Sequence, residues 1–168
     1  MNDPGARSVA KAAALVRVER ADGHARVVAC AALVPGDRIM LLEGDLVPRP
    51  SRYSIQYDET HHIEVPANGV SQDGDDPYAW RFLNHSCRPN ARVRARELLA
   101  VRAIAPGDEI TFDYETTEWQ LACPFTCRCG TCDGRHVRGF RFLPPAERES
   151  RTKRLAEHLL ARIDAPVA

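Results

Sequence analysis

Apolar and polar residues alternate over many short stretches of this 168-residue chain. An alternation with a period of two is typical of β-strands, because successive side chains of a strand point to opposite faces. Segments of this kind are expected at about 14–18, 25–29, 38–42, 52–57, 61–65, 91–95, 97–103 and 109–113. The pattern therefore predicts a mostly β domain built from short strands.

Turn signals separate these segments. A loop is expected at 66–77, which contains the dipeptides Asn-Gly and Asp-Gly, and a tight turn is expected at 105–108, which reads Ala-Pro-Gly-Asp. Glycine, proline, asparagine and aspartate favour turns because each adopts or stabilises a turn conformation. Residues 1–12 show no such alternation and are predicted to form a flexible tail.

The pattern changes near the C-terminus. After Pro144-Pro145, apolar residues recur at helical spacing at Leu155, Leu159, Leu160 and Ile163. A proline suits the first turn of a helix, since the missing N–H has no partner there in any case. The segment 144–168 is predicted to form an amphipathic helix that packs against the β core, and a helix that binds a partner is the alternative.

Composition limits the class of protein. The chain has 44% hydrophobic residues and equal numbers of basic and acidic residues, 23 of each, which fits one compact domain. A net charge of zero gives no long-range attraction for nucleic acid, so no direct nucleic-acid binding is predicted. No apolar run approaches the roughly 20 residues of a membrane span. We expect a cytoplasmic protein, with a monomer as the default state.

Three polar motifs interrupt the strand pattern. Residues 82–90 read FLNHSCRPN, residues 107–114 read GDEITFDY, and residues 127–132 read CRCGTC. The first is too dense in short polar side chains for an ordinary core strand, and the second ends a strand pattern on a phenol. No paired carboxylates or Ser-His-Asp arrangement accompanies them. The motifs offer instead polar groups that can fix a ligand and an aromatic pair that can wall a narrow channel.

Together these motifs resemble the SET family of protein-lysine methyltransferases, over residues 20–143 or so. The resemblance implies a β-clip, or pseudoknot, of short sheets, with a zinc-binding post-SET segment and a C-terminal α-helix. The implied boundaries are 1–12 for the tail, 13–116 for the SET domain, 117–143 for the post-SET segment and 144–168 for the helix. The implied function is methylation of lysine side chains in a protein substrate, with S-adenosylmethionine as the donor. The alternative is a catalytically weakened SET-fold module that binds peptides.

The resemblance also assigns the catalytic residues. Tyr114 matches the catalytic tyrosine, whose hydroxyl would lie beside the sulfonium and the transferring methyl group. Phe112 lies two residues earlier and is expected on the same strand face. A phenylalanine at this position of the family leaves room for further methyl groups, which predicts di- or trimethylation. Tyr53 resembles a second tyrosine that lines the lysine channel.

The implied cofactor site contains one departure from the family. The predicted cofactor-binding residues are Gly23, Arg26, Arg81, Asn84, His85 and Phe140. The two glycines of the family's Gly-x-Gly correspond here to His24 and Arg26, and Gly23 stands one place early. Glycine matters at such a site because it tolerates positive φ and has no Cβ to obstruct a ligand. Either Gly23 serves through a shift of one residue, or the affinity for the cofactor is reduced.

Two of these cofactor assignments have specific alternatives or roles. Arg26 is a candidate partner for the carboxylate of the donor's methionine part. Phe140 is a candidate to stack on the adenine, and packing against the C-terminal helix is the alternative for this residue.

The cysteine motif is implied to bind zinc. By resemblance, one ion is held by Cys87, Cys127, Cys129 and Cys132. Four thiolates suit a closed, tetrahedral structural site, which would hold the following segment over the active site. The spacing between the last two cysteines is shorter than is usual in the family, and a redox pair of Cys129 and Cys132 is the alternative. Cys123 is either a substitute ligand or a free thiol, and Cys30 is expected to be a small core residue.

Overall fold

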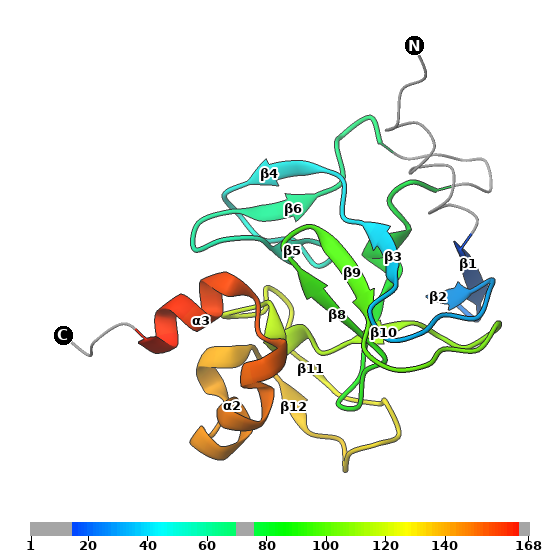
Figure 1. Ribbon diagram of the computed structural model, residues 1–168. Helices are drawn as coiled ribbons and strands as arrows, with labels where there is room; N and C mark the ends of the chain where they lie inside the picture. The colour runs from blue at the N-terminus through cyan, green and yellow to red at the C-terminus, as the bar shows by residue number, and fades with distance from the viewer. Residues whose placement is uncertain (1–14, 70–75, 165–168) are drawn as a thin grey trace.

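The computed structural model describes residues 15–69 and 76–164 (Figure 1). The predicted tail at 1–12 lies outside the described residues, as does part of the predicted loop at 66–77. Within the described residues, short strands form five small sheets, and helices occur chiefly at the C-terminal end. The predicted mostly β fold is therefore confirmed.

The first sheet is an antiparallel hairpin of β1 (Val16–Ala21) and β2 (His24–Ala29). The turn between them is Asp22-Gly23, with φ of 51° and 76°. Positive φ at both central residues is the geometry that matches the twist of a two-residue hairpin, and glycine adopts it without a steric penalty. The sequence at this turn therefore fixes the position of the hairpin tip.

Two three-stranded antiparallel sheets form the centre of the domain. One has the order β3 (Arg38–Leu41), β9 (Glu97–Ala100), β8 (Ala91–Arg94), and the other has the order β4 (Asp45–Val47), β6 (His62–Glu64), β5 (Ile55–Gln56). Their inward-facing apolar side chains form one core with residues of β2. Fully buried members of this core include Val27, Ile39, Leu42, Ile63, Leu98 and Ile110.

A parallel pair joins two of the polar motifs. β7 (Asn84–His85) pairs with β10 (Thr111–Phe112), in the register Asn84 to Thr111 and His85 to Phe112. Parallel strands need a crossover connection, which is supplied here by the β8–β9 hairpin. The 3₁₀ turn Ala79–Phe82 precedes β7, and a second 3₁₀ turn, Tyr114–Thr116, follows β10. The pairing thus brings the NHSC and GDEITFDY motifs side by side.

The C-terminal part of the chain packs beside this core (Figure 1). The antiparallel pair β11 (Phe125–Thr126) and β12 (His136–Val137) leads into a 3₁₀ turn at Phe140–Phe142. The helix α2 (Pro145–Arg151) follows, and after the 3₁₀ turn Thr152–Arg154 comes α3 (Glu157–Asp164). As predicted, a proline stands in the first turn of α2.

The predicted C-terminal helix is present, but within the described residues it is divided into two short helices, α2 and α3. Leu155 is extended, with ψ of 144°, and the backbone N–H of Ala156 donates to the carbonyl of Thr116 at 2.8 Å. Both residues are buried at the break. The interruption brings Leu155 into a second apolar cluster with Phe140 and Leu159, which one continuous helix would not place there.

Most other differences from the sequence pattern concern very short strands. The predicted strand at 52–57 is a strand only at Ile55–Gln56, because a turn with hydrogen bonds between Ser51 and Ser54 precedes it. β4, β7, β11 and β12 were not predicted, since strands of two or three residues show no periodicity. Cys30 is exposed at the end of β2, so its predicted core position is wrong. The predicted turn at 105–108 is confirmed by the hydrogen bond from the N–H of Asp108 to the carbonyl of Ala105, 3.0 Å.

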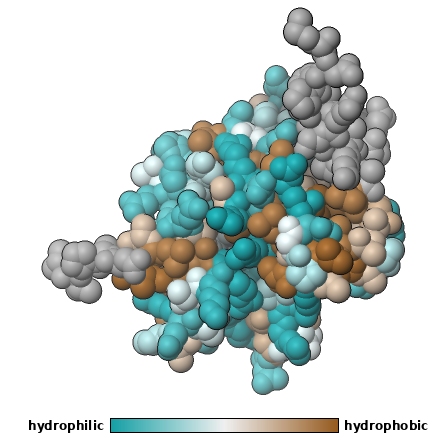
Figure 2. Space-filling view, in the orientation of Figure 1, coloured by the Kyte–Doolittle hydropathy of each residue, from teal (hydrophilic) through white to brown (hydrophobic). Residues whose placement is uncertain are grey.

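Hydrophilic residues cover much of the face shown in Figure 2, with hydrophobic residues gathered over the β1–β2 hairpin and beside α3. Among the helices that the structure describes, none is long and apolar enough to cross a membrane.

Candidate functional site

An open cleft of about 1530 Å³ lies between the β1–β2 hairpin, the segment 51–55, the β7–β10 pair and the segment 121–129. It brings together segments that are far apart in the sequence. All but one of the predicted catalytic and cofactor-binding residues line it, namely Gly23, Arg26, Tyr53, Arg81, Asn84, His85, Phe112 and Tyr114. The exception is Phe140.

Tyr114 begins the 3₁₀ turn that follows β10. Its hydroxyl donates a hydrogen bond to the carbonyl of Leu83, 2.5 Å away, and its backbone N–H donates to Nδ1 of His85, 3.2 Å away. The alternation predicted that Tyr114 shares a strand face with Phe112, but Tyr114 lies on the turn after the strand. The two rings nevertheless meet directly, with centroids 4.9 Å apart.

The environment of Tyr114 keeps its hydroxyl protonated. Burial raises the pKa of this phenol above its usual range, and the negative charges of Glu118 and Glu109 raise it further. Because the hydroxyl does not ionise near neutral pH, it remains a hydrogen-bond donor. A fixed phenolic dipole in a cleft can orient a neutral amine and stabilise charge that develops beside it.

His85 connects Tyr114 to the cysteine motif. Burial lowers the pKa of its imidazole to about 4, and the ring is therefore neutral. Since Nδ1 accepts from the backbone of Tyr114, Nε2 carries the hydrogen, and it lies 3.4 Å from Sγ of Cys87. The side chain is 2% exposed. Both ring nitrogens thus face protein atoms, which leaves only the backbone of His85 for a ligand in the cleft.

Asn84 ties the hairpin to the β7–β10 pair. Its Nδ2 donates to the carbonyl of Ala25 at 3.0 Å and to Oε1 of Glu109 at 2.8 Å. The residue is exposed to the cleft. Glu109 was not identified from the sequence, although it stands within the GDEITFDY motif, two residues before β10 begins.

The two predicted arginines of the cofactor site are already paired. Nη2 of Arg26 lies 2.7 Å from Oε2 of Glu19, and Nη2 of Arg81 lies 2.7 Å from Oδ2 of Asp76. Around Gly23, an added Cβ would meet no atom within 4 Å, so the glycine is required by its positive φ and not by close packing. The hairpin tip therefore leaves open space beside the cleft.

Tyr53 and Phe140 occupy very different surroundings. Tyr53 is 49% exposed in the turn before β5, and the guanidinium of Arg52 lies 5.6 Å from its ring centre. Phe140 is completely buried and packs with Leu155 and Leu159. The predicted stacking of Phe140 on a ligand is therefore contradicted, and packing against the C-terminal helices is the role that the structure shows.

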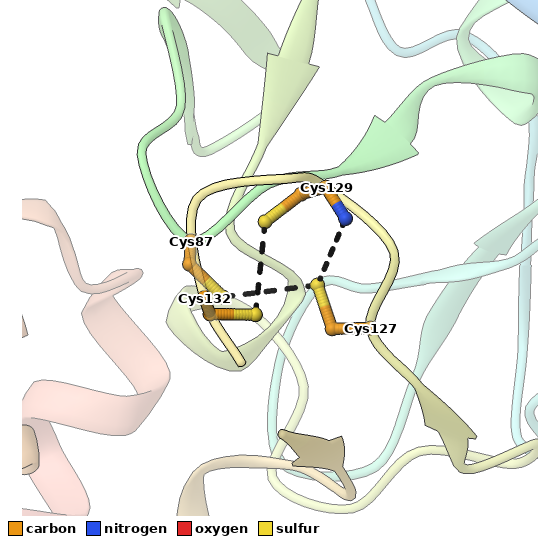
Figure 3. A group of neighbouring side chains, drawn as sticks. All are labelled: Cys87, Cys127, Cys129 and Cys132. Atoms are coloured by element: carbon orange, nitrogen blue, oxygen red, sulfur yellow. Dashed lines mark hydrogen bonds between the residues drawn. The ribbon is translucent and has the colours of Figure 1, made fainter. Parts of the chain in front are cut away.

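The four predicted metal ligands form one group (Figure 3). The sulfur atoms of Cys87, Cys127, Cys129 and Cys132 all lie within 4.8 Å of one another. Sγ of Cys87 is 3.8 Å from that of Cys127, and Sγ of Cys129 is 3.9 Å from that of Cys132. A tetrahedron with zinc–sulfur bonds of about 2.3 Å has sulfur–sulfur edges of about 3.8 Å. The group therefore fits a closed zinc site.

The surroundings of the cysteine group agree with this fit. Burial raises the pKa of the Cys87 thiol above its usual range, so a bound cation is needed to hold it as a thiolate. Nη1 of Arg135 and Nε2 of His85 lie 3.9 and 3.4 Å from the same sulfur and would donate to a thiolate there. Cys129 and Cys132 share one group with two further thiols, which favours a metal over a redox pair. Cys123 lies outside the group and lines the cleft as an exposed, free thiol.

Sequence reasoning missed a buried ionic network behind Tyr114. Nε of Arg151 lies 2.8 Å from Oδ2 of Asp113, and Nη2 of Arg135 lies 2.6 Å from Oε2 of Glu115. Both carboxylates are 1% exposed. The network joins α2 and the residue before β12 to the turn that carries Tyr114. No local pattern indicated it, because its partners lie 20 or more residues apart and charged helix residues are usually solvated.

The model of the SET domain family matches residues 14–115. The chain belongs to the SET-domain family. The match spans both the NHSC strand and Tyr114, and it ends before the cysteine motif.

Relatives and solved structures agree with this membership. The chain is 34% identical over 96 residues to the histone-lysine N-methyltransferase ash1 of Drosophila melanogaster, which covers 51% of this chain and 4% of that protein. It is 37% identical over 54 residues to the methyltransferase flvH of Aspergillus flavus, covering 30% of each. A crystal structure of KRYPTONITE in complex with mCHG DNA and SAH has a TM-score of 0.50 and 22% identity, and the match covers 69% of this chain and 27% of that one.

The extent of these matches limits what they show. The chain spans 4% and 30% of the length of the first two relatives. The structural likeness, at 22% identity, shows the fold alone. The fold and the family are established, and activity and substrate are inferred below from the site.

Proposed function

We propose that this protein transfers methyl groups from S-adenosylmethionine to lysine side chains of a protein substrate. The observation that carries the proposal is the position of Tyr114: its hydroxyl is fixed by the carbonyl of Leu83 inside a cleft that the NHSC strand also lines. The relatives supply independent support, because ash1, flvH and ASHH1 are all named methyltransferases.

The cofactor would bind on the side of the cleft formed by the hairpin and β7. Asn84 and the backbone of His85 stand there, beside the open space at Gly23. Arg26 and Arg81 are held in place by Glu19 and Asp76, so each presents a positioned guanidinium to an anionic group of the ligand. When bound, S-adenosylmethionine supplies a methyl group on a positively charged sulfur.

The target lysine would enter from the side of Tyr53, which stands exposed in the turn before β5. Tyr114 would orient the amine toward the methyl group. Phe112 presents no hydroxyl to the channel and packs at 4.9 Å from the ring of Tyr114. Because nothing at this position holds a water molecule in the way of a second methyl group, we propose di- or trimethylation.

Zinc would have a structural role. The four-cysteine group joins the loop after β7 to the segment 127–132, and His85 links that loop to Tyr114. A metal there would fix the wall of the cleft that the segment 121–129 forms, since the free energy of metal binding becomes free energy of folding. We propose a SET domain at 13–116 and a zinc-binding post-SET segment at 117–143, followed by the two helices.

The substrate class is a protein, because the relatives named histone-lysine N-methyltransferases act on a protein lysine. Core histones are therefore the first probe, and a whole-cell protein extract is the second. A cytoplasmic location remains a prediction.

The test combines binding with transfer. We expect S-adenosylhomocysteine to raise the melting temperature of the protein, since a ligand that binds only the folded state stabilises it by mass action. We also expect label from methyl-labelled S-adenosylmethionine to appear on lysines of core histones or of extract proteins, located by mass spectrometry. If S-adenosylhomocysteine causes no thermal shift and no label is transferred, a peptide-binding module is the better description of the protein.

A further inference from the structure

Glu118 is a buried carboxyl group on the wall of the cleft, and the function proposed above gives it no role. The residue is 5% exposed, yet it belongs to the lining of the cleft together with Tyr53 and Tyr114. Its backbone N–H donates to the carbonyl of Tyr114 at 2.9 Å. Glu118 is therefore attached to the turn that carries the catalytic tyrosine.

One oxygen of this carboxyl group is fixed and the other is available. Oε1 accepts hydrogen bonds from the backbone N–H of Gln56 at 2.7 Å and from the hydroxyl of Thr117 at 3.1 Å. Oε2 lies 3.9 Å from Nε2 of His62, which is beyond hydrogen-bonding distance. No lysine or arginine of the described residues forms an ion pair with Glu118. The side chain thus has a set orientation with an unpaired oxygen.

The groups that face Glu118 do not neutralise its charge. Burial lowers the pKa of His62, which packs from β6, so that this ring is neutral. Tyr114, on the adjoining turn, stays protonated because burial raises its pKa. Burial also raises the pKa of Glu118 itself, to about 7, so the carboxyl group gains and loses a proton near neutrality.

A buried carboxylate without a cation is costly, because desolvation is not offset by a partner. The cost disappears when a cation enters the cleft and meets it. A lysine side chain arrives as an ammonium, with an ordinary pKa of about 10.4, and it must lose a proton before its nitrogen can attack. Because Glu118 lines the cleft together with Tyr114, its carboxylate can meet the ammonium as a counter-ion and can also accept the proton.

We propose that Glu118 binds the ammonium of the target lysine and accepts its proton before methyl transfer, an inference that rests on the proposed lysine methylation. An N–H bond of the ammonium breaks, an O–H bond forms on Oε2, and the electron pair stays on nitrogen. That pair then forms the new N–C bond to the methyl group, while the S–C pair remains on sulfur. Glu118 returns its proton to water through the open cleft.

The competing explanation is that Glu118 only fixes the loop at Gln56. Replacement by glutamine separates the two, because E118Q keeps an oxygen for the N–H of Gln56 and removes the charge. E59Q is the matched control: Glu59 is an exposed acid on the turn between β5 and β6, and it does not line the cleft.

The experiment measures kcat/KM against pH for the wild type, E118Q and E59Q. The probe is a pool of synthetic peptides with one central lysine and randomised neighbours, together with S-adenosylmethionine. We expect the wild-type rate to rise through about pH 7 and level off. E118Q should be at least 10-fold slower at pH 7 and should approach the wild type as the pH nears the pKa of free lysine, while E59Q keeps the wild-type profile. A parallel loss at every pH, or no loss, overturns the inference.

A second measurement uses only the wild type, so it does not require that E118Q folds. The carboxyl carbon of Glu118 in the wild type is titrated by NMR with bound S-adenosylhomocysteine and either a lysine peptide of that pool or the same peptide with norleucine. We expect the lysine peptide alone to lower the pKa of Glu118, since only it brings a positive charge. Equal titration with both peptides contradicts the inference. If the wild type neither binds S-adenosylhomocysteine nor transfers a methyl group, the proposed function fails first, whereas an active wild type with an unaffected E118Q refutes only the role of Glu118.

Discussion

The hydroxyl of Tyr114 and the carbonyl of Leu83 are joined by a hydrogen bond of 2.5 Å. Leu83 directly precedes β7, and Tyr114 stands two residues after the end of β10, the strand that pairs with β7. One hydrogen bond therefore connects the FLNHSCRPN and GDEITFDY motifs. It also sets the direction in which the phenol points.

Replacement of Tyr114 by phenylalanine tests this relationship. We expect Y114F to lose at least about 100-fold in kcat, comparable with the loss of one positioned donor in other enzymes. The carbonyl of Leu83 loses its partner, which costs the fold about 1–3 kcal/mol. The measurements are labelled methyl transfer and urea denaturation. Y78F, which removes a phenolic hydroxyl outside the cleft, serves as the control, and undiminished transfer by Y114F would exclude the catalytic role.

A second prediction concerns the number of methyl groups added. Phe112 is 3% exposed and packs against Tyr114 on the wall of the cleft. In F112Y the new hydroxyl can hold water in the channel, so we expect the product to shift from di- and trimethyl-lysine toward monomethyl-lysine. Mass spectrometry of the methylated substrate gives the distribution. Identical distributions for the two proteins would show that this residue does not control the degree of methylation.

The cysteine group predicts one zinc ion per chain. Elemental analysis should find it in the purified protein, and C132S should lose it together with much of the thermal stability, because three thiolates no longer close the site. C30S is the matched control, since Cys30 is exposed and lies outside the group. Acid should release the metal as the thiolates are protonated. A metal-free protein with unchanged melting temperature would remove zinc from the description.

The buried carboxyl group of Glu118 predicts a pH-dependent stability difference. Its pKa is about 7 in the folded protein, against an ordinary value of about 4.5. Between these values the folded state binds more protons than the unfolded state, so the free energy of unfolding falls as pH rises, by at most roughly 3 kcal/mol in total. E118Q lacks this contribution. Urea denaturation at pH 5 and pH 8 should therefore show that the free energy of unfolding of E118Q, relative to that of the wild type, is higher at pH 8 than at pH 5.

The control for that experiment is E59Q, whose exposed side chain should leave the pH dependence of the wild type intact. If the stability difference between E118Q and the wild type were the same at both pH values, Glu118 would not titrate in this range.

Several features were determined by the sequence alone. The Ala-Pro-Gly-Asp turn, the proline in the first turn of α2 and the longer alternating strands are local, because each depends on residues that are neighbours in the chain. The density of polar residues in FLNHSCRPN and the phenol at the end of GDEITFDY likewise identified the part of the cleft lining that lies at β7, β10 and the turn after β10. The short cysteine spacing, which differs from that of the family, still allowed all four sulfur atoms to meet.

Only the tertiary structure decided the rest. The strand β7 has two residues and exists because it pairs with β10, so the sequence shows no periodicity there that would predict it. Phe140 is buried and does not line the cleft. The helical segment is interrupted at Leu155, and this places Leu155 and Leu159 against Phe140 in a second apolar cluster. Glu118 and the pair of Asp113 with Arg151 acquire their properties from burial and from partners distant in the sequence. Desolvation and long-range pairing depend on the folded arrangement of the whole domain, and a linear pattern of residue types carries no measure of either.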